Sequence, residues 1–187
     1  MRVIAGKARR LLLKTVPGNS TRPTTDQIKE TLFNMMQPYL PGSSFLDLFA
    51  GSGAIGIEAL SRGAARAVFV ENDRRACNCI RENLTHTRLE EDALLVQGDV
   101  LRTLQTMQPA NRFDIIFMDP PYDRGLEKDV LTILRDSPLA DAETLIVVEA
   151  SNRTDFSYLE VLGYETVRTK EYKTNRHLFL RKLVEHA

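Results

Sequence analysis

The sequence predicts an α/β protein built on a doubly wound, mostly parallel β-sheet. In the central part of the chain, short apolar runs alternate with amphipathic stretches, which is the pattern of strands joined by crossover helices. The apolar runs are nearly continuous, as expected when helices cover both faces of a sheet. A length of 187 residues and a hydrophobic content of 43% suffice for one substantial core.

Seven strands are expected in this sheet. Five apolar runs supply the parallel strands, at residues 44–48, 67–71, 93–97, 113–118 and 144–149. The segments that follow them have helical spacing and begin near Gly53, Asp73, Asp99, Leu126 and Asp155. The last two strands, at 164–171 and 176–183, are predicted to form an antiparallel pair at the edge of the sheet.

Residues 1–40 are predicted to form a small extension in front of the main domain, which takes up residues 41–187. Residues 2–13 have the pattern of a β-hairpin that turns at Gly6. A helix follows at 26–37, with Thr25 or Asp26 as its N-terminal cap.

The net charge of zero conceals a strong asymmetry along the chain. Residues 1–29 hold seven basic residues and one acidic residue, and residues 166–182 hold six basic residues and one acidic residue. The stretch 30–165 between them carries a net charge of −10. Basic ends around an acidic middle favour a polyanionic partner such as a nucleic acid, although charged runs are more often simply solvated surface.

Several classes of protein are poor fits to the sequence. Cys77 and Cys79 lie two residues apart in a helical segment and point to different faces, so they form neither a disulfide framework nor a zinc site. His86, His177 and His186 are scattered, and we expect no metal site. No apolar run approaches the roughly 18 residues that span a bilayer, and no targeting segment is evident. We therefore expect a cytoplasmic protein that does not contact membranes.

The first chemical motif, Asp-Leu-Phe-Ala-Gly-Ser-Gly-Ala-Ile-Gly at residues 47–56, lies where the first strand turns into its helix. Glycines at this turn let a ligand approach the backbone, and Glu71 at the end of the second strand is placed to bind both hydroxyls of a ribose. Together they indicate a cofactor that contains adenosine. The candidate cofactor-binding residues are Asp47, Phe49, Ala50, Gly51, Ser52, Gly53, Glu71, Asp99, Val100 and Asp119.

An NAD site is the alternative for this motif, because Gly51, Gly53 and Gly56 match the G-x-G-x-x-G pattern. A lone match of that kind is weak evidence. Asp47 argues against it, since a carboxylate beside a pyrophosphate repels it but suits a cofactor that carries an ammonium group. Asp99 after the third strand could accept a hydrogen bond from an adenine amino group, and its alternative role is that of a helix N-cap.

The second motif, Asp119-Pro120-Pro121-Tyr122, directly follows the fourth strand and is more specific. Two prolines stiffen the turn and remove two N–H donors, which leaves carbonyls and one carboxylate to accept hydrogen bonds from an exocyclic amine. Tyr122 offers a flat face on which a base can stack, an interaction worth about 1 to 3 kcal/mol. A strand-ending turn with a buried tyrosine is the structural alternative.

The glycine loop followed by Asp-Pro-Pro-Tyr resembles the class I methyltransferases that use S-adenosylmethionine to methylate exocyclic amines of bases. The resemblance extends to the RsmD family of 16S rRNA methyltransferases over essentially the whole chain. It rests on residues 2–9, Arg-Val-Ile-Ala-Gly-Lys-Ala-Arg, on 21–24, Thr-Arg-Pro-Thr, on 46–53 and on 58–64, Glu-Ala-Leu-Ser-Arg-Gly-Ala. One departure is Gln-Ile-Lys-Glu at 27–30, where the family pattern leads us to expect Arg-Val-Arg-Glu.

This resemblance implies a Rossmann-like methyltransferase sheet and methylation of the N2 amine of one guanine in 16S rRNA, within a small ribosomal subunit or an assembly intermediate. The expected cofactor is S-adenosylmethionine, and a monomer is expected. Asp119, Pro120 and Tyr122 are then the candidates for catalysis. The candidates for RNA binding are Arg2, Lys7, Arg9, Arg10 and Arg22, although residues 22–24 could instead close over the carboxylate of the cofactor.

Three other functions stay open at this stage. An N-methyltransferase that acts on DNA or on a protein amide would share both motifs and differ only in its substrate. An NAD-dependent oxidoreductase would share the glycine loop and Glu71 alone. A non-catalytic RNA-binding module would use the basic ends but would give no role to residues 119–122.

Overall fold

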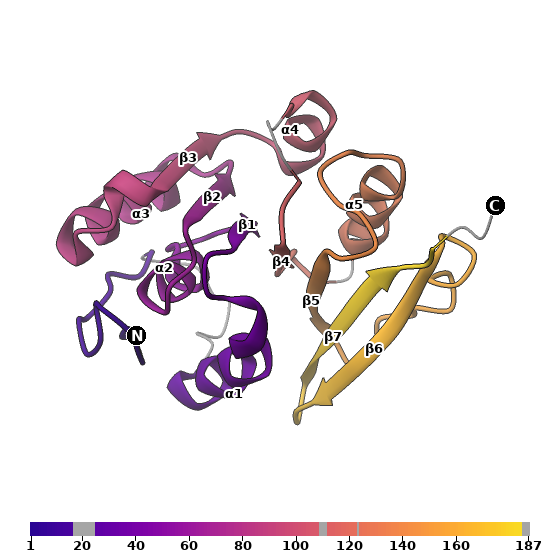
Figure 1. Cartoon of the computed structure of the whole chain (residues 1–187), viewed down its shortest axis with the longest axis horizontal. Coiled ribbons are helices and arrows are strands. Elements are labelled where there is room, and N and C mark those ends of the chain that lie inside the picture. Colours follow the sequence, from indigo (N-terminus) through magenta and orange to yellow (C-terminus); the bar gives the residue numbers. More distant parts are fainter. Residues whose placement is uncertain (17–24, 109–111, 123, 185–187) are drawn as a thin grey trace.

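The computed structural model describes residues 1–16, 25–108, 112–122 and 124–184 of the chain (Figure 1). Within them lies a seven-stranded sheet with the order β3-β2-β1-β4-β5-β7-β6. The strands are β1 (Ser44–Leu48), β2 (Arg66–Glu71), β3 (Ala93–Gln97), β4 (Ile115–Met118), β5 (Leu145–Ser151), β6 (Tyr164–Glu171) and β7 (Asn175–Lys182). The α-helices are α1 (Asp26–Met36), α2 (Ala54–Ser61), α3 (Arg74–Thr87), α4 (Val100–Thr106) and α5 (Leu126–Arg135).

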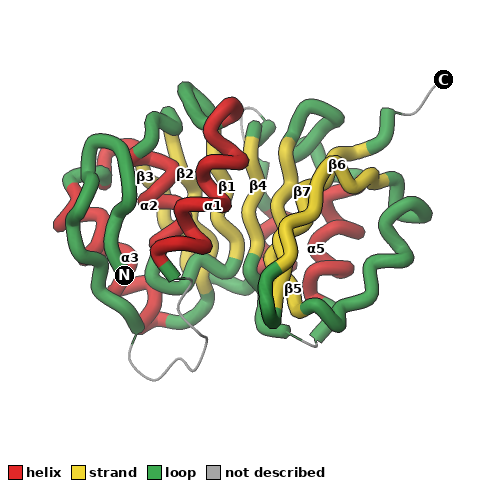
Figure 2. The backbone as a smooth tube through the Cα atoms, turned by 90° about the horizontal axis from the view of Figure 1, so that it is seen from below, coloured by secondary structure: helices red, strands yellow, loops and turns green. Residues whose placement is uncertain are grey.

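Strands β1 to β5 are parallel, and β7 runs antiparallel to both of its neighbours, β5 and β6. Helices α1, α2 and α3 cover one face of the sheet and α4 and α5 cover the other (Figures 1 and 2). Successive residues of each strand therefore enter different cores: Phe45 packs in the core under α1 and α2, and Leu46 in the core under α5. The doubly wound fold with its antiparallel C-terminal pair is confirmed.

One predicted helix is wrong. The segment after Asp155 has helical spacing, but the structure contains a series of turns up to Gly163 and no helix there. The segment has backbone hydrogen bonds of mixed spacing (Leu159 to Phe156, Leu162 to Tyr158), and Gly163 ends it with a left-handed backbone (φ of 79°), which reverses the chain into β6. Its apolar side chains still pack on the sheet, because Leu159 is 7% exposed in the core under α5.

The predicted N-terminal hairpin is reduced to one antiparallel bridge, between Arg2 and Leu12. The loop in between packs against the end of α2, where the Lys7 amide donates a hydrogen bond to the Ser61 carbonyl (2.8 Å). Gly6 lies so close to Ser61 that a Cβ on Gly6 would be 1.7 Å from the Ser61 carbonyl oxygen. Val3 is fully buried in the core that the sheet shares with α1. The extension thus packs on the main fold, and its separation as a unit of its own stays a prediction.

A buried ion cluster joins this segment to α1 and α2. The Glu58 carboxylate accepts hydrogen bonds from the Ile4 amide (2.8 Å), the Ala5 amide (3.0 Å) and the Arg62 guanidinium (2.8 Å). Lys29 lies 3.2 Å from the same carboxylate, and both side chains are fully buried. Burial lowers the pKa of Lys29. Lys29 belongs to the basic N-terminal stretch, but this burial removes it from any surface that binds a polyanion.

The described residues include no helix that is both long and apolar enough to cross a membrane. Cys77 and Cys79 are both buried, and neither is in a disulfide.

Candidate functional site

Three carboxylates from the two motifs gather at the carboxyl edge of the parallel strands. Asp47 is in β1, which pairs with both β2 and β4, so that Glu71 and Asp119 end the strands on either side of it. Ligands of doubly wound sheets bind at this edge, where the strand order reverses on the two sides of β1. The fold thus brings both sequence motifs to one place.

The glycine loop between β1 and α2 is a strained turn with open space on its outer side. Phe49, Gly51 and Gly53 all have left-handed backbones, with φ of 59°, 57° and 77°. Phe49 is the unusual member, because left-handed backbone is costly for a bulky side chain and concentrates at functional sites. A Cβ placed on Gly51 would meet nothing within 4 Å. A ligand can therefore reach the backbone at this glycine.

Glu71 is fixed by three backbone amides next to this open space. Its carboxylate accepts hydrogen bonds from Gly51 (2.8 Å), Asn72 (2.8 Å) and Asp73 (2.9 Å). The carboxylate is therefore pre-oriented beside the loop, and an acidic group in this position fits the hydroxyls of a ribose.

Asp47 is buried beneath the glycine loop and binds the backbone at the start of α2. Its carboxylate accepts a hydrogen bond from the Gly56 amide (2.9 Å), and only 1% of the residue is exposed. Burial raises the pKa of Asp47 from 3.8 to about 8. The observed bond holds the first turn of α2 in place, and contact of Asp47 with an ammonium group stays a prediction.

Asp99 has the role that was its alternative interpretation, that of the helix N-cap: its carboxylate accepts a hydrogen bond from the Arg102 amide (3.0 Å) at the start of α4. Its side chain is exposed at the ligand edge, and the adjacent Gly98 amide bonds to the Glu71 carbonyl (2.9 Å). Val100 is buried in the core under α4, so only its backbone is available to a ligand. Cofactor contacts of both residues stay predictions.

The Asp119–Tyr122 turn follows β4 directly. Pro120 is buried, whereas Tyr122 is 43% exposed. Within the described part of the chain, no group donates a hydrogen bond to the Asp119 carboxylate. Burial, together with the charges of Glu149 and Asp47, raises the pKa of Asp119 well above its usual value. An unpartnered carboxylate beside an exposed aromatic ring is suited to bind a planar group that carries an amine.

A polar network behind this turn was missed from the sequence. Glu149 in β5 is 5% exposed and accepts hydrogen bonds from Asn175 Nδ2 (2.7 Å) and, more weakly, from the Tyr122 hydroxyl (3.4 Å). Its other oxygen lies 3.0 Å from Nε2 of the fully buried His177. Burial and the charge of Glu149 raise the pKa of Tyr122. Glu149 thus connects Asp119's turn to β7.

One signal for Glu149 was present in the sequence. Like Glu71, it is an acidic residue near the end of a buried strand, which places it at the ligand edge. Its partners could not be found in this way, because they depend on the antiparallel register that sets Glu149 opposite His177.

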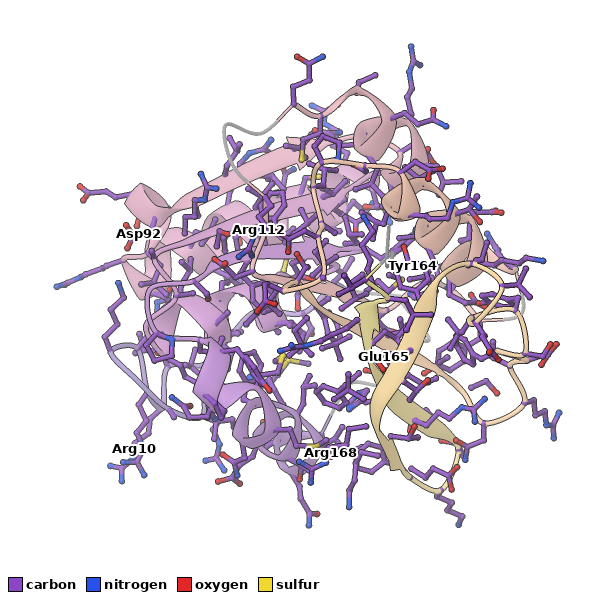
Figure 3. All side chains as sticks on the ribbon, turned by 45° about the vertical axis from the view of Figure 1, so that its right-hand side comes forward. Arg10, Asp92, Arg112, Tyr164, Glu165 and Arg168 are labelled. Atoms are coloured by element: carbon purple, nitrogen blue, oxygen red, sulfur yellow. The ribbon has the colours of Figure 1, made fainter. Side chains whose placement is uncertain are left out.

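The basic N-terminal candidates differ in their surroundings. Arg2 and Lys7 form ion pairs on the surface, with Asp26 (2.7 Å) and Asp92 (3.2 Å). Arg9 and Arg10 are exposed, and Arg10 reaches away from the body of the protein (Figure 3). Arg22 and the rest of 21–24 lie outside the described residues, so the choice between RNA and cofactor for that segment is not tested.

Residues 1–181 match the family described as "Conserved hypothetical protein 95". The chain is 40% identical over 172 residues to "Putative rRNA methyltransferase YlbH" of Bacillus subtilis, which covers 91% of this chain and 92% of that protein. It is 39% identical over 150 residues to "Ribosomal RNA small subunit methyltransferase D" of Escherichia coli, which covers 80% and 74% of the two chains.

The fold comparison agrees with the sequence comparison. The solved structure of "Putative methyltransferase yhhF from Escherichia coli" superimposes with a TM-score of 0.84 at 34% identity and covers 99% of both chains. The sheet is therefore that of a methyltransferase fold. The chain is thus similar in sequence to the ribosomal RNA small subunit methyltransferases D, and the match over residues 1–181 shows that it belongs to the Conserved hypothetical protein 95 family.

Proposed function

We propose that this protein transfers a methyl group from S-adenosylmethionine to the N2 amine of a guanine in 16S rRNA of the small ribosomal subunit. The observation that carries the proposal is the Asp119–Tyr122 turn beside the open glycine loop: the Asp119 carboxylate accepts no hydrogen bond from the described residues, and Tyr122 is partly exposed. The names of the relatives support rRNA as the substrate.

The residues at the glycine loop fit this cofactor. Glu71 would hold the ribose hydroxyls, and the open space beside Gly51 would let the ligand approach the backbone of the loop. When bound, S-adenosylmethionine supplies a methyl group that its sulfonium already activates.

The protein then has mainly to position the amine, which is a poor nucleophile because its lone pair is delocalised into the ring. Asp119 would accept hydrogen bonds from the N2 hydrogens, and the Pro120 carbonyl could accept another. Tyr122 would stack on the base. Orientation of this kind can contribute roughly 7 to 11 kcal/mol, and the carboxylate stabilises the positive charge that develops on nitrogen. The base must lie in a loop or be flipped out of its stem to reach the turn.

Asp119 has to be ionised to accept these hydrogen bonds. Since its pKa is raised by burial and by Glu149 and Asp47, the rate of methyl transfer should fall as the pH falls through that raised pKa. A pH profile of the rate at saturating substrate measures this. A rate that does not fall as the pH is lowered to the acid limit of the folded protein would contradict the role of the carboxylate.

The main test is transfer of labelled methyl from S-adenosylmethionine to small ribosomal subunits from a strain that lacks this gene, with mass spectrometry of the modified nucleoside. N2-methylguanosine at a single site is the expected product. Methylation of DNA or of a protein amide instead would replace the substrate in the proposal and keep the reaction class.

The Asp119→Ala variant tests the division of roles at the site. It should abolish methyl transfer and keep cofactor affinity within a few-fold, because the carboxylate serves the amine. An equal loss of cofactor affinity would refute that division.

Replacing both Arg9 and Arg10 by alanine should lower the salt dependence of RNA binding by about one unit of slope for each lost phosphate contact.

A further inference from the structure

A cleft of about 660 Å³ lies between the N-terminal segment and α3, outside the site described above. Leu12 and Lys14 form one wall, and Arg81 and His86 belong to the wall that α3 supplies. Its volume is within the range of roughly 300 to 1,000 Å³ that is usual for small-ligand sites. Figure 2 shows the N-terminal loop beside α3, in agreement with these lining residues.

Asn83 holds the two walls of this cleft together. Its side chain accepts a hydrogen bond from the Lys14 amide (2.8 Å) and donates to the Lys14 carbonyl (3.0 Å). The same amide group donates to the Ser52 carbonyl (2.9 Å) in the glycine loop. Asn83 is 1% exposed, so these bonds form away from competing water. The cleft is therefore a built feature in a fixed position relative to the cofactor loop.

The cleft lies on a basic surface, although residues 30–165 as a whole carry a net negative charge. Helix α3 contains one acidic residue, Glu82, and its exposed arginines are Arg74, Arg75 and Arg81, with Arg88 at its C-terminal cap. Within the described residues no carboxylate pairs with Arg81, which donates only to Asn78 Oδ1 (2.9 Å).

The acidic groups near this surface are few, and two of them are already paired. Glu82, which itself lines the cleft, forms an exposed ion pair with Lys14 (2.6 Å). Asp73 is exposed at the N-cap of α3 and accepts hydrogen bonds from the Arg75 and Ala76 amides. Asp92, in the acidic turn that follows α3, is paired with Lys7 (3.2 Å). Glu90 and Glu91 of that turn are exposed and mark the end of the basic surface.

The lining of the cleft matches the chemistry of a nucleotide. Arg81 offers donors for phosphate oxygens, and the ammonium group of Lys14 keeps further N–H donors beside its pair with Glu82; positively charged side chains supply most contacts to a nucleic-acid backbone. Leu12 is 70% exposed and His86 is exposed, so an apolar side chain and a flat ring are available to a ribose or an unstacked base. A single nucleotide combines phosphate, ribose and base, so it can use the charges, the apolar wall and the ring together, whereas an acidic residue of a protein uses the charges alone.

We propose that the cleft between residues 12–14 and α3 is a second RNA-binding site, which takes a nucleotide of the substrate away from the base that is modified. This inference rests on the proposed function, because it assumes that the substrate is RNA. The site would hold the RNA by its backbone and leave the target base to the Asp119–Tyr122 turn.

The test compares RNA affinity for wild type and for Arg81→Ala combined with His86→Ala, over a range of salt concentrations and with 16S rRNA as the probe. We expect the Kd for RNA to be roughly 5- to 50-fold higher and the slope of its salt dependence to be lower by about one, with an unchanged affinity for S-adenosylmethionine. KM for RNA should rise while kcat at saturating RNA stays the same. Arg135→Ala serves as the matched control, because it removes an exposed helical arginine from α5 on the other face.

A gain of affinity gives a second readout that misfolding cannot imitate. Glu82→Gln removes the carboxylate beside Lys14 and should tighten RNA binding. If wild type binds RNA and both variants bind it as wild type does, the cleft proposal is overturned and the proposed function is not affected. If the variants respond as expected but no methyl group is transferred to rRNA, the cleft is supported and the proposed reaction fails. If the wild-type protein does not bind RNA, both the cleft proposal and the proposed function are overturned.

Discussion

Glu58→Gln should strongly destabilise the protein, because four donors converge on this fully buried carboxylate. The Ile4 and Ala5 amides, Arg62 and Lys29 all lie within 3.2 Å of it. A glutamine has only one oxygen, so its amide group would face at least one of these donors. The substitution also leaves Lys29 and Arg62 without a negative charge in a buried environment.

The expected loss follows from that geometry. Breaking one partner of a buried ion pair typically costs about 3 to 5 kcal/mol of unfolding free energy. For a domain of this size, each kcal/mol corresponds to roughly 2 to 4 °C in Tm, so Tm should fall by roughly 6 to 20 °C. Urea unfolding and differential scanning calorimetry measure both quantities. The N-terminal segment should also become sensitive to limited proteolysis, since Glu58 holds its Ile4 and Ala5 amides.

Glu30→Gln is the matched control for this experiment. It is the next residue to Lys29 in α1, but its side chain is exposed, and it should change stability by less than about 0.5 kcal/mol. A loss below about 1 kcal/mol for Glu58→Gln would refute the argument that this cluster holds the segment. Combining Lys29→Met with Glu58→Gln should cost less than the sum of the two single changes, because the double variant removes both charges of the pair.

Three further predictions concern the site and its support. Glu149→Gln should reduce kcat by on the order of 10²-fold through displacement of Tyr122, with unchanged cofactor affinity in calorimetry; an unchanged kcat would show that Glu149 does not position the ring. Gly56→Ala should lower the midpoint of urea unfolding by an amount that corresponds to about 1 to 3 kcal/mol, because the added Cβ would be 2.3 Å from the ring of Phe69, and a midpoint equal to that of wild type would contradict this close packing. For Asp47, whose pKa rises from 3.8 to about 8 on folding, the folded protein keeps a proton that the unfolded chain has lost. Its contribution to stability should therefore decrease as the pH rises from about 4 to 8, and Asp47→Asn should show a flatter dependence of Tm on pH.

The sequence was sufficient to predict the fold class, the seven strands and the position of both motifs. The strands are near-continuous apolar runs, and parallel strands order their carboxyl ends at one edge, so that Glu71 and Asp119 could be placed without coordinates. The helix expected after Asp155 is absent: the spacing of its apolar residues is helical, but the segment folds into successive turns that end at the left-handed Gly163.

What could not be predicted depends on contacts between distant parts of the chain. The basic count at the N-terminus included Lys29, and only the fold shows that it faces Glu58 in the interior. The partners of Glu149 depend on the register between β5 and β7, and the basic surface of α3 depends on which of its residues face outward. Local sequence patterns carry no information on such contacts between distant residues.

The position of β7 has a consequence for when the protein becomes active during its synthesis. Asn175 and His177, which hold Glu149 behind Tyr122, are synthesised after β1 to β6, and β7 must insert between β5 and the earlier strand β6. A nascent chain that has formed β1 to β5 already carries the glycine loop and the Asp119 turn, but Glu149 lacks its partners. Slippage of β7 by one residue would also turn His177 to the opposite face of the sheet. The site is therefore finished only after β7 has been synthesised and has paired with β5 in the correct register.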